Sequence, residues 1–120
     1  MKPNSACLLT TIPPQGQESD RRIEGFFMVR NDFLGNQCHD GRIKAHETYR
    51  IALPSDLRPS YWDYFQHGES FPHWGRVTFK YFSTDIMHTI LHDAAQKLTG
   101  TAQQETAEAF LEYFREMNRL

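Results

Sequence analysis

The stretch STDIMHTILHDAAQKLTGTAQQETAEAFLEYFREMNRL (83–120) decides the fold of this chain. Its first half places apolar residues three and four positions apart, which is the spacing of one helix face. Those residues are Ile86, Met87, Ile90, Leu91, Ala94, Ala95 and Leu98. Ser83 or Thr84 can cap the N-terminus, and Gly100 follows the last apolar position, where glycine commonly ends a helix. The pattern predicts a helix over residues 84–98.

A second helix is predicted after Gly100. Thr101-Ala-Gln-Gln104 has the spacing of a capping box, in which two side chains satisfy backbone N–H groups of the first turn. The apolar positions that follow are Ala107, Phe110, Leu111, Phe114 and Met117. Two helices this close in sequence are expected to form a hairpin. Both apolar stripes must then be covered by another part of the chain.

The chain before Ser83 alternates apolar and polar residues, which is typical of strands with one face in water. Strands are predicted over residues 22–33, 43–53 and 74–82, with residues 8–12 at a sheet edge. In the first strand the odd positions, such as Phe27 and Val29, are expected to face the core. Phe26 and Met28 are expected on the polar face. In the second strand the core positions include Tyr49, Ile51 and Leu53.

An aromatic segment separates the second and third predicted strands. Pro59 near its start and Gly68 near its end predict a short helix over residues 60–67. Packing the helical hairpin on the apolar sheet face buries both stripes. The sequence therefore predicts one α+β domain over residues 1–120. It has a small antiparallel sheet of three to four strands in the N-terminal two thirds, covered on one face by the C-terminal helical hairpin, with a short helix around residues 59–67.

The composition restricts the classes of function. A chain of 120 residues with 39% hydrophobic and 23% charged residues is typical of a folded domain. Its net charge of −2 gives no general attraction to nucleic acid or anionic lipid. No apolar run approaches a membrane span and no signal sequence is visible, so a cytoplasmic location is expected. Cys7 and Cys38 lack C-x-x-C spacing, and reduced thiols are expected.

The first candidate site is a histidine pair at helical spacing. His88 and His92 lie four residues apart and Asp85 precedes them by about one turn, so three metal-ligating side chains share one helix flank. Zinc needs three or four ligands, and the glutamate of H-E-x-x-H hydrolases is missing here. Solvated surface side chains are the simpler explanation, with a metal-dependent hydrolase as an alternative. No cofactor is predicted.

The second candidate is a basic, aromatic face of the predicted sheet. Such faces bind single-stranded nucleic acid, because bases stack on the rings while phosphates contact arginine and lysine. The basic residues are Arg42, Lys44, Arg50, Arg76 and Lys80. Acidic residues on the same strands and the net negative charge oppose this function. A nucleic-acid-binding protein is therefore an alternative and is not favoured.

Two features favour contact with another protein. One is the aromatic segment, because a short helix cannot bury every ring and tryptophan and tyrosine are enriched at interfaces. Its residues are Tyr61, Trp62, Tyr64, Phe65 and Trp74. The other is an acidic ridge on the last predicted helix, formed by Glu108, Glu112 and Glu116 beside Glu105.

The favoured hypothesis is a small soluble interaction module of the inhibitor or adaptor type, without catalytic activity of its own. The sequence has no phosphate-binding loop, nucleophile elbow or paired metal motif, and this favours a binding protein over an enzyme. The partner is another protein, and an apolar edge of the helical hairpin leaves a homodimer as an alternative. In this hypothesis Trp62→Ala abolishes partner capture and leaves the thermal midpoint nearly unchanged.

Overall fold

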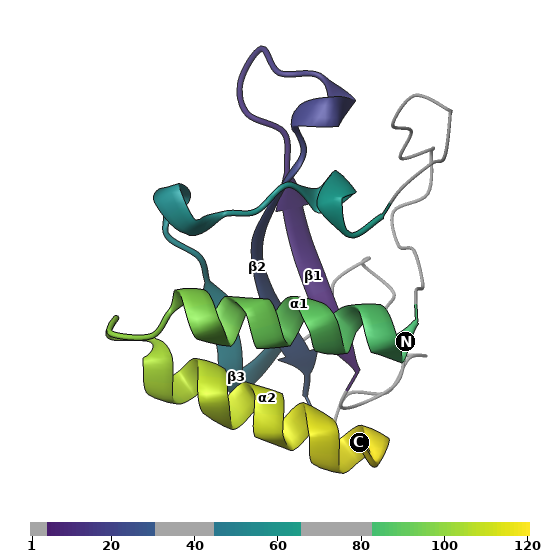
Figure 1. Cartoon of the computed structure of the whole chain (residues 1–120), viewed down its shortest axis with the longest axis vertical. Helices are drawn as coiled ribbons and strands as arrows, with labels where there is room; N and C mark the ends of the chain where they lie inside the picture. Colours follow the sequence, from purple (N-terminus) through teal and green to yellow (C-terminus); the bar gives the residue numbers. More distant parts are fainter. Residues whose placement is uncertain (1–4, 31–44, 66–82) are drawn as a thin grey trace.

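The computed structural model describes residues 5–30, 45–65 and 83–120, and it has the predicted α+β architecture. Strands β1 (Ala6–Thr11), β2 (Arg22–Val29) and β3 (Ala45–Ala52) form an antiparallel sheet in the order β1-β2-β3. Helices α1 (Thr84–Lys97) and α2 (Gln104–Asn118) pack against each other, and α2 also packs against β3. Figure 1 shows both helices in front of the strands. The predicted strand over residues 74–82 lies outside the described residues.

The first predicted helix is confirmed. The Ser83 hydroxyl accepts a hydrogen bond from the Ile86 amide at 3.3 Å, so it caps α1 as expected. Gly100 has a φ of 85°, which is the backbone region that glycine adopts most easily. The predicted stripe is buried at all positions except the half-buried Ile86. No helix in the described part of the chain is long and apolar enough to cross a membrane.

The start of α2 differs from the predicted capping box. The helix begins at Gln104, and no side chain caps it. The Thr101 hydroxyl donates to the Leu98 carbonyl at 2.6 Å and accepts from the Gln103 amide at 3.2 Å. The Gln104 side chain accepts from the Gly100 amide at 2.8 Å. Thr101 and Gln104 therefore stabilise the connection between the helices, because the Thr101 hydroxyl already pairs with the end of α1.

The short helix predicted in the aromatic segment is present, but it is shorter than residues 60–67. Its described part is a single 3-10 turn, η4 (Tyr61–Asp63), which follows another such turn, η3 (Ser55–Leu57). Tyr64 and Phe65 follow η4 without helical structure, and residues 66 and 67 lie outside the described residues. Aromatic side chains lose rotamer freedom in a helix, and here a tight turn brings their rings together instead.

A bulge in β2 reverses the predicted orientation of its residues. Leu9 of β1 pairs with Gly25, and the next residue, Thr10, pairs with Ile23, so Glu24 has no partner on β1. One inserted residue reverses the side-chain alternation beyond it.

Two predictions for β2 are therefore wrong. Phe26 and Met28 face the helices and are buried in the core, whereas they were expected on a polar face. By alternation, the half-buried Phe27 lies on the opposite face, whereas Val29, expected in the core, is completely buried but outside the main core cluster. On β3 the predicted core face is confirmed, because Ile51 and Leu53 are buried and Tyr49 packs against the core.

Gly25 gives a test of this strand arrangement. A Cβ atom there would overlap the backbone carbonyl oxygen of Ile51, and backbone cannot move aside as a side chain can. We expect Gly25→Ala to lower the free energy of unfolding by about 2 kcal/mol, as measured by urea denaturation. Ala52→Ser, at the exposed residue that pairs with Gly25, is the control and should change little. Equal midpoints for the two variants would contradict the pairing.

Candidate contact surfaces

The described part of the aromatic segment packs on the core. Tyr61 is buried, and Trp62, Tyr64 and Phe65 are half-buried against the core. The Tyr61 ring stacks on Phe65 with centroids 4.4 Å apart and meets the Trp62 ring edge-on at 4.8 Å. Tyr61 therefore belongs to the main core, and the other three rings pack against it. Trp74 lies outside the described residues, and the predicted contact role of the segment stays a prediction.

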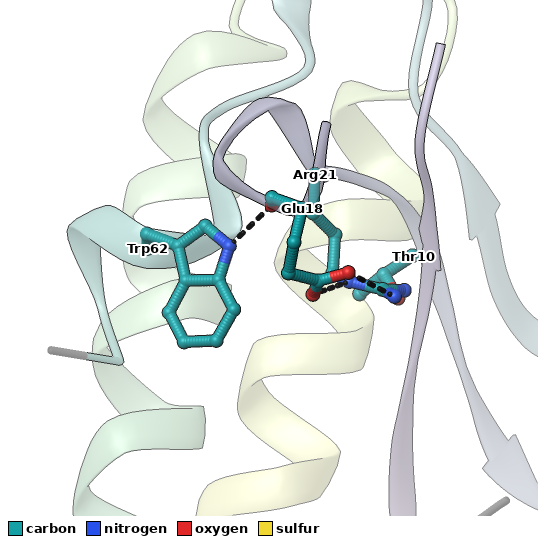
Figure 2. Close-up of polar contacts among 4 residues, drawn as sticks. All are labelled: Thr10, Glu18, Arg21 and Trp62. Carbon is teal, nitrogen blue, oxygen red and sulfur yellow. Dashed lines mark hydrogen bonds and ion pairs between the residues drawn. The ribbon is translucent and has the colours of Figure 1, made fainter. Parts of the chain in front are cut away.

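A polar cluster fixes Trp62 to a segment far away in the sequence (Figure 2). Its indole Nε1 donates to the backbone carbonyl of Glu18 at 2.7 Å. Glu18 belongs to the 3-10 turn η1 (Glu18–Asp20) between β1 and β2. Arg21 donates to both carboxylate oxygens of Glu18, at 2.6 and 3.0 Å, and to the Thr10 hydroxyl at 2.7 Å. The cluster therefore joins β1, η1 and η4.

Backbone hydrogen bonds reinforce the same junction. The Ile23 amide donates to the Pro59 carbonyl, and the Tyr61 amide donates to the Arg21 carbonyl, both at 2.9 Å. Sequence reasoning missed Arg21, although the Glu18/Arg21 spacing of three residues is a local sign of an ion pair. Its guanidinium group is mostly buried and its charge is matched by Glu18, so the structure gives Arg21 a structural role.

These contacts change the expectation for Trp62. We expect Trp62→Ala to lower the free energy of unfolding by about 2 kcal/mol, because it removes ring packing and an indole hydrogen bond. Trp62→Phe retains most of the ring packing and should lose about 1 kcal/mol. Both values come from chemical denaturation, with Asp63→Ala at the exposed neighbouring position as the control. An unchanged denaturation midpoint in Trp62→Ala would contradict this expectation and indicate that Trp62 behaves as a surface residue.

Tyr64 ties the aromatic segment to α1. Its hydroxyl donates to Asp93 Oδ2 at 2.6 Å. Burial is the main cause that raises the pKa of Tyr64, and the hydrogen bond and negative charge of Asp93 raise this pKa further. The adjoining cavity has a volume of about 10 Å³ and is lined mainly by apolar side chains such as Ile23, Leu53 and Ile90. This cavity is about the size of one water molecule, so it is too small for a substrate.

The raised pKa of Tyr64 predicts that the folded protein loses stability at alkaline pH. An unperturbed tyrosine has a pKa of about 10 and the folded value is higher, so folding favours the neutral hydroxyl. This contribution is fully present below pH 10 and is lost as the pH rises above it. We expect the free energy of unfolding to fall less steeply above pH 10 in Tyr64→Phe than in the unmodified protein. At pH 7 the variant should be less stable by about 1.5 kcal/mol. Parallel pH curves would contradict the assignment.

The histidine pair is not assembled as a metal site in the described structure. His88 Nε2 accepts a hydrogen bond from Arg115 Nε at 2.9 Å, so this ring nitrogen already has a partner. His92 is exposed, with its Nδ1 3.8 Å from Asp93 Oδ1, and Asp85 is exposed. Across residues 5–30, 45–65 and 83–120, no three His, Cys, Asp or Glu side chains are grouped to hold a metal ion.

The basic sheet face lies only partly within the described residues. Arg50 is exposed on β3, as predicted. The other four basic residues predicted on this face lie outside the described residues: Arg42, Lys44, Arg76 and Lys80. The strand pairing of Cys7 with Phe27 and of Leu9 with Gly25 shows that the face opposite the helices is largely apolar here. Burial raises the pKa of the Cys7 thiol to about 11, which keeps it protonated at neutral pH.

The acidic ridge of α2 is exposed as predicted. Glu105, Glu108, Glu112 and Glu116 all lie at the surface, and the Gln104 side chain donates to Glu108 Oε1 at 3.1 Å. Arg115 turns away from the ridge toward His88.

The last turn of α2 corrects one prediction. Met117 was expected among the buried positions of the helix, but it is 47% exposed, and Leu120 is 55% exposed. Both residues lie at the end of the chain, beyond Phe114, the last buried residue of α2. Two apolar side chains, one in the last turn of α2 and one just beyond the helix, are therefore exposed, which periodicity alone does not show.

Comparison with known proteins adds no relative from which a role could be transferred. No family model, curated protein or solved structure matches the chain. The geometry of the described residues is therefore the basis for a functional proposal. The α2 ridge has charged side chains in solvent at regular spacing, whereas the aromatic segment is packed against the core.

Proposed function

We propose that this chain acts by contact with another protein and has no catalytic role of its own, and that the partner contacts the outer face of α2. The observation that carries the proposal is the run of exposed carboxylates at Glu108, Glu112 and Glu116. The side chains of Met117 and Leu120, at the C-terminal end of α2 and just beyond it, are also exposed. Interfaces commonly combine an apolar contact with a charged rim. Here the glutamates lie along α2, and the exposed apolar side chains lie at its C-terminal end and just beyond it.

The charge of α2 favours a basic partner. Between Gln104 and Leu120 there are four glutamates and two arginines, which gives a net charge of 2 − 4 = −2. The Arg115 side chain is directed toward His88 of α1 by a hydrogen bond, so its positive charge is turned away from the exposed carboxylates. Exposed carboxylates attract a basic surface over long range and raise its association rate. The same carboxylates disfavour pairing of two copies through this face, because like charges would then meet.

The aromatic segment supports the domain in this proposal. Trp62 is held by Glu18 and Tyr64 by Asp93, and the Tyr61 ring is buried. Binding through these rings would require them to leave their packed positions, which costs free energy. We therefore assign the contact to α2 and a scaffold role to the described part of the aromatic segment.

Charge reversal on α2 tests the proposal. The variant carries Glu108→Lys, Glu112→Lys and Glu116→Lys, and Glu47→Lys at an exposed position of β3 is the matched control. We expect the unmodified protein and the control to capture the same partner by affinity purification with quantitative mass spectrometry. The triple variant should lose at least about tenfold in affinity, and binding of the unmodified protein should weaken with salt.

Thermal unfolding of each variant separates binding from folding. The three glutamates are exposed, so their reversal should leave the midpoint nearly unchanged. Equal partner affinity of the triple variant and the unmodified protein would move the contact away from α2. Absence of any specific protein partner for the unmodified chain would contradict the proposed function itself.

A further inference from the structure

We draw no further inference here: the strongest candidate, the apolar face of the sheet opposite the helices around Leu9, Phe27 and Val29, carries no proposal because nothing in the described residues shows what covers it.

Discussion

The edge-to-face contact between Phe26 on β2 and Phe110 on α2 joins the two layers of this domain, with ring centroids 5.3 Å apart. Both residues are almost completely buried, and Tyr49 of β3 adds a second edge-to-face contact to Phe110. A two-layer domain is stable only if the apolar face of each layer meets the other. The position of α2, and with it the acidic ridge on its outer side, depends on this contact.

Helical features were predictable because their signals are local. The apolar spacing, the Ser83 cap and the stop at Gly100 each involve residues within about one turn of each other, and the structure confirms all three. The orientation of β2 was not predictable by the same reasoning. It depends on a bulge at Glu24, and a bulge is a property of two paired strands, so alternation within one strand gives the wrong face for Phe26 and Met28.

The candidate surfaces show the same difference between local features, which sequence predicts, and contacts between distant segments, which it does not. Periodicity correctly predicted that Glu108, Glu112 and Glu116 are exposed, because a helix with one buried face presents the other face to solvent. It could not show that Trp62 would meet Glu18, 44 residues away, or that Met117 would remain exposed. Residue type suggested an interface role for Trp62, whereas its actual surroundings are set by contacts between segments far apart in sequence.

The junction of Thr10, Glu18, Arg21 and Trp62 has a consequence for the dynamics of the chain. Its hydrogen bonds connect the turn before β2 to the turn after β3, so neither turn can open without breaking contacts of the other. Segments connected in this way open as one cooperative unit in the native state. We therefore expect the amide protons of Ile23 and Tyr61, which are 38 positions apart in sequence, to belong to the same unit and to exchange with solvent at a common opening free energy.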